Sequence, residues 1–126
     1  MSQDLRQPAV TTATGLHGWP DRMRPLIHIL LHFLVPGMIA WVVYRQHWQR
    51  AWVIMVLTML VDVDHLLAMP IYDPHRCGIG FHPLHTWWAI AVYCGMLALP
   101  RTRLIGAGLV IHMALDASDC VWMALT

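Results

Sequence analysis

Residues 51–72 read AWVIMVLTMLVDVDHLLAMPIY, an apolar stretch that carries three ionisable side chains in its second half. A hydrocarbon core takes about 20 helical residues, so this stretch is long enough to cross one. Asp62, Asp64 and His65 stand out in it, because an Asp at the centre of a spanning helix costs roughly 2.5–3.5 kcal/mol on insertion scales. Such residues normally face the interior of a helix bundle and mark a functional site.

The rest of the chain has the same character, with 58% apolar and only 12% charged residues. Three more apolar stretches cover residues 25–44, 83–99 and 104–125, and aromatic residues gather near their ends as in membrane-interface belts. Residues 1–24 contain no continuous apolar segment typical of a secretory signal. We therefore expect an all-α integral membrane protein, with an N-terminal tail at 1–24 and a four-span, four-helix bundle at 25–126.

Each apolar stretch carries residues of the types that bind metals. These residues are His28 and His32; Asp62, Asp64 and His65; His82 and His85; and His112, Asp116 and Asp119. If the four spans alternate in direction, every cluster falls on the same side of the membrane. Residues three or four apart share a helix face, so each pair can point at one centre. The pattern predicts a single polar metal site near one membrane face.

Two residue types in this pattern have more than one interpretation. In a regular helix Asp62 and His65 share a face while Asp64 points away. Either the helix unwinds there, or Asp64 lies outside the ligand set and holds a histidine ring. A lone membrane histidine is commonly a hydrogen-bonding residue, and His17 and His47 fit that description. Without metal, so many buried polar groups would require an equally extensive hydrogen-bond network.

The number and type of candidates indicate the metal. Zinc takes about four ligands, which is fewer than the candidates available, so two or three ions with a bridging Asp fit better than one. Imidazole and carboxylate ligands suit zinc first, with manganese or iron as alternatives. Cys77, Cys94 and Cys120 are odd in number and lack CxxC spacing, so we expect free thiols in the core or in loops.

Three motifs, in this order, point to a known family. Asp62-Val63-Asp64-His65, a histidine-containing loop leading into His85-Thr86, and His112-x-x-x-Asp116 resemble the small bacterial membrane-bound metal-dependent hydrolases over residues 26–120. That family shows D-x-D-H, H-R-G-x-T-H-S and late H-x-x-x-D elements and an early helical histidine. The chain is also distantly similar to the zinc phospholipase C and P1 nuclease group.

The middle motif departs from the family pattern. This chain has His75-Arg76-Cys77-Gly78 followed by His82-Pro83-Leu84-His85-Thr86, so either His75 or His82 can supply the partner of His85. We favour His82, because it is three residues from His85 and shares a helix face with it.

The resemblance implies a metal-dependent hydrolase of the bacterial inner membrane. A two-ion site can activate water near neutral pH and orient a phosphoester. Asp64, His75 and Arg76 are the catalytic candidates, and the Arg76 guanidinium is a candidate phosphate clamp. The depth of the site favours a membrane lipid or lipid-linked substrate, whereas the arginines form no stripe suited to nucleic acid.

Two other functions fit part of the pattern. His28-x-x-x-His32 and His82-x-x-His85 resemble the histidine boxes of di-iron membrane desaturases and hydroxylases. A metal carrier or haem-binding bundle needs no catalysis, but haem takes only one or two axial histidines and leaves the aspartates unexplained. The arginines balance on the two sides of the predicted spans, and the acid-free short loops favour a site that faces away from the cytoplasm.

Overall fold

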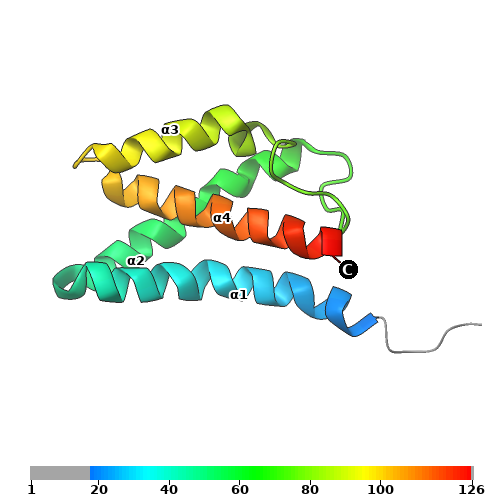
Figure 1. Cartoon of the computed structure of the whole chain (residues 1–126), viewed down its shortest axis with the longest axis horizontal. Helices are drawn as coiled ribbons and strands as arrows, with labels where there is room; N and C mark the ends of the chain where they lie inside the picture. Colours follow the sequence, from blue (N-terminus) through cyan, green and yellow to red (C-terminus); the bar gives the residue numbers. More distant parts are fainter. Residues whose placement is uncertain (1–17, 126) are drawn as a thin grey trace, which may run out of the picture.

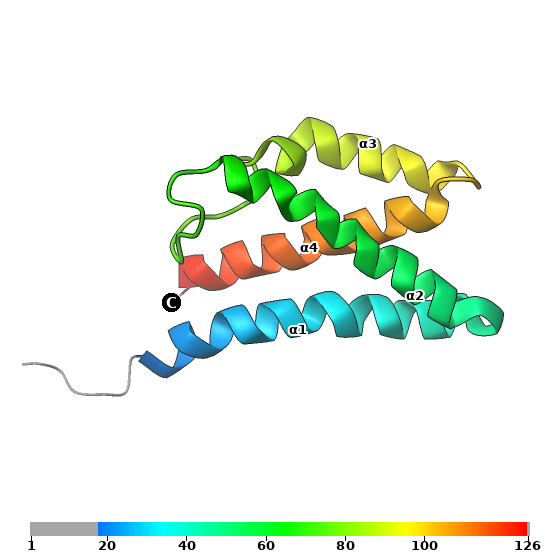
Figure 2. The ribbon, with the colours of Figure 1, turned by 180° about the vertical axis from the view of Figure 1, so that it is seen from behind.

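The computed structural model describes residues 18–125, which form helices, turns and one longer loop without a strand. Its α-helices are α1 (Gly18–Val43), α2 (Trp48–Leu57), α3 (Trp87–Ala98) and α4 (Arg103–Leu125). Figure 1 shows α1 and α4 lying along each other. α2 starts beside the C-terminal end of α1 and crosses behind α4, and α3 lies over α4. The reverse view in Figure 2 shows the same packing. The all-α prediction is confirmed for this part of the chain. Of the tail predicted at 1–24, residues 1–17 lie outside the described residues, and residues 18–24 belong to α1 instead of a tail.

Helix α1 begins at Gly18, before the predicted start at Pro25, and continues through Pro25 and Pro36. Proline has no N–H, so Pro36 interrupts the hydrogen-bond ladder of the helix. Trp52 of α2 docks at this point, and its indole N–H donates to the Phe33 carbonyl at 2.9 Å. A Cβ on Gly37 would lie 3.2 Å from the same indole nitrogen. This contact sets how α2 packs on α1.

The predicted second span is α-helical only in its first part. After Leu57 the chain tightens into the 3-10 helix η2 (Thr58–Leu67). Three residues per turn align every third side chain, and Thr58, Val61 and Asp64 form the buried row. Asp62 and Asp64 are then about 120° apart around the axis, instead of about 160° in an α-helix. The tighter winding therefore lets both carboxylates reach the same side of the bundle.

The loop between η2 and α3 folds back onto the end of α4. Cys77 of the loop and Cys120 of α4 form a disulfide, with Cα atoms 5.1 Å apart, and Cys94 remains a free, exposed thiol. The prediction of free thiols was wrong for this pair. The two cysteines are 43 residues apart, and only the tertiary fold of the loop brings them together.

The interior of the bundle is unusually polar. Two small apolar clusters hold the helices together, one around Met55 and one around Met113. The buried polar residues of the described chain are Arg24, His32, Thr58, Asp64, His82, His85, His112 and Asp116. Large apolar side chains instead point outward, with Leu67 76% and Trp88 85% exposed. Water-soluble proteins have the opposite distribution.

In the described part of the chain, two helices are long and apolar enough to cross a membrane, judged by length and composition. They are residues 22–43 of α1 and the whole of α4. Helix α3 is apolar but has only 12 residues. Of the four predicted spans, the first and the last therefore correspond to helices with the length and composition of a membrane span.

Close packing of α4 on α2 gives a testable prediction. A Cβ at Gly108 would lie 2.8 Å from the Thr58 side chain and 2.9 Å from the Met55 Cα atom. We expect Gly108→Ala to lower the free energy of unfolding by about 1–3 kcal/mol, as overpacking does in well-packed cores. Gly95→Ala is the matched control, because a Cβ there meets nothing within 4 Å and alanine favours the helix. Thermal unfolding in detergent measures both variants, and equal melting temperatures would contradict the packing argument.

Candidate metal centre

The histidines and aspartates predicted from sequence gather at one end of the bundle. They come from the middle of α1, from the second half of η2, from the short 3-10 helix η3 (Pro83–His85) and the residue before it, and from the middle of α4. In Figure 1 these segments lie at the end where α4 finishes and where the long loop folds back. The structure thus brings together side chains from four separate parts of the sequence.

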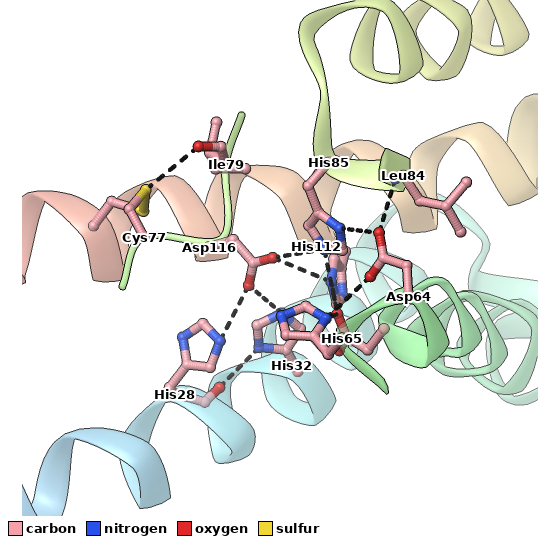
Figure 3. Close-up of polar contacts among 12 residues, drawn as sticks. His28, His32, Asp64, His65, Cys77, Ile79, Leu84, His85, His112 and Asp116 are labelled. Atoms are coloured by element: carbon pink, nitrogen blue, oxygen red, sulfur yellow. Dashed lines mark hydrogen bonds and ion pairs between the residues drawn. A yellow bond between two sulfur atoms is a disulfide. The ribbon is translucent and has the colours of Figure 1, made fainter. Parts of the chain in front are cut away.

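Asp116 of α4 lies at the centre of this group (Figure 3). Its Oδ1 atom is 3.1 Å from His28 Nε2 and 3.5 Å from His32 Nε2. Its Oδ2 atom is 3.2 Å from His85 Nε2 and 3.3 Å from His112 Nε2. Each oxygen of one carboxylate therefore faces a different pair of imidazoles.

The first group of possible metal ligands lies on the Oδ2 side. It consists of Asp62, His85, His112 and Asp116, each with one ligand atom within 4.8 Å of the others. Asp62 Oδ1 is 3.1 Å from His112 Nε2 and 3.3 Å from His85 Nε2. Two imidazoles and two carboxylates form a complete set for a four-coordinate metal such as zinc.

The second group lies on the Oδ1 side and has three members, His28, His32 and Asp116. Three protein ligands are the usual number in catalytic zinc sites, which keep a further position for water or substrate. His28 and Asp116 also line the cavity beside the site, so this position faces the cavity.

The orientation of two rings is suited to metal binding. His32 Nδ1 is 2.9 Å from the His28 carbonyl, and His85 Nδ1 is 3.1 Å from Asp64 Oδ2. A proton on Nδ1 serves each contact and leaves the Nε2 lone pair free for a metal. Both Nε2 atoms are buried without a hydrogen bond in the described part of the chain. Since buried polar atoms are normally satisfied, these nitrogens fit a metal site.

Asp64 supports the rings from outside the two groups. Its Oδ2 atom accepts a hydrogen bond from the Leu84 backbone N–H at 2.8 Å as well as contacting His85. Its Oδ1 atom is 3.1 Å from His65 Nδ1. Asp64, His65 and His85 form a third group close enough for a metal, but these contacts already occupy both carboxylate oxygens. Of the two alternatives considered for Asp64, the structure shows the contact that holds a histidine ring; the chain does not unwind there but tightens into the 3-10 helix η2.

His65 and His82 form a stacked pair at the edge of the centre, with ring centroids 3.8 Å apart. His65 Nδ1 also lies 3.5 Å from Asp62 Oδ1. The His82 ring is 5.8 Å from that of His85, and His82 belongs to none of the three ligand groups. Burial and the neighbouring His65 ring lower the pKa of His82 below its usual value.

Three other residues proposed from sequence lie away from the ligand groups. His75 is exposed in the loop, where its backbone N–H donates to Asp73. Arg76 donates to the carbonyls of Pro70 and Ile71 at 2.8 and 3.1 Å. Asp119 pairs with an arginine, 3.5 Å from Arg24 Nε. The structure therefore places Asp119 in an ion pair instead of among the clustered ligands.

A cavity of about 280 Å³ opens beside the two ligand groups. Asp62, His65 and His82 join His28 and Asp116 in its polar wall. Arg24, one of the arginines that flank the predicted spans, also lines it and is only 7% exposed. Spacing contained a signal for Arg24, because it precedes His28 by four residues and so shares its helix face.

The fold and site define a class of protein: a helical bundle with an apolar exterior and a histidine–aspartate centre at one end. The chain belongs to the DUF6122 family, a family of unknown function that matches residues 22–123. This match includes all the residues of the three ligand groups. No curated protein and no solved structure matches the chain.

The contacts of Asp64 lead to a prediction about metal affinity. Carboxylates that orient metal-binding histidines typically contribute 10–100-fold to metal affinity. We expect Asp64→Asn to weaken zinc binding by about that factor, because it alters the contacts to His85 and His65. Asp119→Asn, the same change at an aspartate outside the ligand groups, should retain zinc affinity. Competition with a chromogenic chelator measures both, and equal affinities for the two variants would contradict the assignment.

Proposed function

We propose that the protein is an integral membrane metal-dependent hydrolase that cleaves a phosphoester of a lipid or another membrane-embedded substrate. The observation that carries the proposal is the position of Asp116, whose two oxygens face two separate pairs of histidines at 3.1–3.5 Å. A carboxylate placed in this way can bridge two ions. The residues fit two divalent ions, zinc first, with manganese or iron as alternatives.

The two ions have different surroundings in this proposal. His85, His112 and Asp62 complete the ligands of one ion, while His28 and His32 hold the other and leave a position open to the cavity. Two bound ions supply a Lewis acid and a water-derived nucleophile near neutral pH. The protein residues fix the ligand rings, exclude bulk water from the buried side and leave one side open for a phosphoester.

The membrane setting is supported by the distribution of side chains. Polar groups lie inside the bundle and large apolar groups lie outside, as lipid surroundings require. α2 and η2 follow each other from Trp48 to Leu67, which supports a further span besides α1 and α4. With α3, these segments form the proposed four spans. The ligand groups then lie within the membrane, between the middle of α1 and the middle of α4 on the side where η2 ends and α3 begins, and this depth favours a lipid substrate.

The disulfide supports an orientation for the site. Cys77 and Cys120 are joined at the end of the bundle that carries the ligand groups. Disulfides persist in oxidising compartments and are rare in the cytosol. We therefore place the site on the non-cytoplasmic side of a bacterial inner membrane.

The main alternative is a di-iron oxidase. Carboxylates and histidines from neighbouring helices also hold paired iron ions in helical bundles, so the bridging position of Asp116 suits this function as well. A haem site is less suited to the geometry. The His28 and His32 rings are 4.4 Å apart, and the His32 and His112 rings are 4.5 Å apart, with Asp116 between the nitrogens. This packing leaves no flat slot for a macrocycle.

The bridging role of Asp116 predicts an unequal loss of metal among variants. Purified protein should carry two transition-metal ions per chain. Asp116→Ala should lose both ions, His28→Ala should lose one, and His47→Ala, in the turn at the opposite end, should lose none. Elemental analysis after dialysis measures the content. One ion in the parent protein, or two ions retained by Asp116→Ala, would exclude the bridged site.

The hydrolase proposal predicts metal-dependent activity. A chelator should abolish hydrolysis of a lipid phosphoester in mixed micelles, and added zinc or manganese should restore it. His28→Ala should reduce turnover to the chelated level, since it removes a ligand of the ion whose open position can take water. The His47→Ala protein is again the control. Iron at the centre together with oxygen-dependent oxidation of an acyl chain, and no hydrolysis with any metal, would favour the oxidase instead.

A further inference from the structure

Two arginines line the cavity next to the metal ligands. Arg24 comes from α1 and Arg76 from the loop between η2 and α3. We propose that Arg24, assisted by Arg76, forms a subsite that binds the phosphate group of the ligand beside the ion held by His28, His32 and Asp116. This inference rests on the proposed metal centre for its charge balance, and it assigns the chemical class of the group that is bound.

The Arg24 guanidinium is buried but only partly paired. Its Nε atom lies 3.5 Å from Asp119 Oδ1, longer than the 2.7–2.9 Å of a strong charge-assisted hydrogen bond. Its Nη2 group donates to the Pro74 carbonyl. Among the described residues no contact of the Nη1 group is present, so this side can take another acceptor. A guanidinium offers its donors in a planar fork that matches the oxygens of a phosphate.

Arg76 is held in place before any ligand binds. Its Nη2 group donates to two carbonyls of the loop, and its guanidinium lies 4.8 Å from the centre of the Phe81 ring. The neighbouring Cys77 ties the loop to α4 through the disulfide. An immobilised side chain loses less conformational entropy when a ligand binds, so this arrangement favours recognition.

The charged side chains that line the cavity predict that phosphate binds more tightly when metal is bound. The carboxylates that line the cavity are those of Asp62, Asp73, Asp116 and Asp119, and they outnumber the two guanidiniums. With the histidines of the cavity neutral, the metal-free cavity carries an excess of negative charge and disfavours a phosphate. Two divalent cations reverse the sign, so the loaded site attracts one.

The cavity also has an apolar wall formed by Ile29, Ile71 and Met123. This wall suits the alkyl part of an amphiphile, whereas inorganic phosphate contacts only the charged part. A phosphate carried by a lipid should therefore bind more tightly than free phosphate. Comparing the two ligands identifies the source of the group.

The test uses the full chain in detergent micelles, loaded with zinc. Inorganic phosphate and short-chain phosphatidic acid are the two probes, and isothermal titration measures their affinities. We expect Arg24→Gln to weaken both by about tenfold or more, since hydrogen bonds to charged groups contribute about 1.5–3 kcal/mol. Arg24→Lys should recover part of the loss. Arg50→Gln, an exposed arginine on α2, should bind like the parent.

Two further variants guard against a folding effect, because Arg24 also anchors the loop through Pro74. Asp119→Asn should bind phosphate more tightly, since it removes the carboxylate that competes for Arg24. Arg76→Gln should bind it more weakly. Zinc content, measured in parallel, should match the parent in both. A loss of phosphate affinity caused only by disturbed packing would not give opposite signs in these two variants.

Each outcome has a defined meaning. Parent-like phosphate affinity in Arg24→Gln and Asp119→Asn overturns the subsite, as does equal binding by metal-free and zinc-loaded protein. Arg24-dependent phosphate binding without hydrolysis of any phosphoester supports the subsite and rejects the hydrolase. Tighter binding of phosphatidic acid than of inorganic phosphate supports a lipid source, and equal binding overturns it.

Discussion

The contact of one carboxylate with four imidazoles is the constraint on which the rest of this structure depends. Histidine side chains from the middle of α1, from η3 and from the middle of α4 lie within 3.1–3.5 Å of the Asp116 carboxylate. The apolar clusters around Met55 and Met113 are small by comparison. In the proposed membrane setting, apolar contact gives little drive for helices to associate, so polar contacts carry more of the specificity. Metal binding in such a site also contributes to folding, because the ligands are gathered only in the folded state.

The helix that supplies Asp116 is also shaped for close approach. Gly108, His112 and Asp116 are spaced by four residues and so lie along one face of α4. At Gly108 this face contacts the Thr58 side chain so closely that a Cβ would lie 2.8 Å from it. One turn further on, the same face presents His112 Nε2 at 3.1 Å from Asp62 Oδ1. A small residue in α4 thus lets the start of η2 approach, and this approach brings the Asp62 carboxylate to the ligands.

Much of the site could be predicted from local spacing, because pairs three or four residues apart share a helix face whatever the tertiary fold. The pairs His28–His32 and His112–Asp116 are of this kind. Features that depend on contacts between distant segments could not be predicted in the same way. The number of candidate ligands predicted a bridging Asp without identifying it, and only the packing of α1 against α4 places Asp116 between two histidine pairs. The Cys77–Cys120 disulfide likewise depends on how the long loop folds.

Asp64, Asp116 and Asp62 have the same side chain but different positions in the site. Their exposed fractions follow this order, from the most buried to the most exposed. Asp64 has a side chain that is 3% exposed, and both of its oxygens are committed to rings and a backbone N–H. Asp116 is 11% exposed and lies between the two ligand groups. Asp62 is 39% exposed and borders the cavity that His28 also lines. In the proposed site, each ion therefore has a ligand on the wall of one cavity, so a single phosphoester in that cavity can reach both.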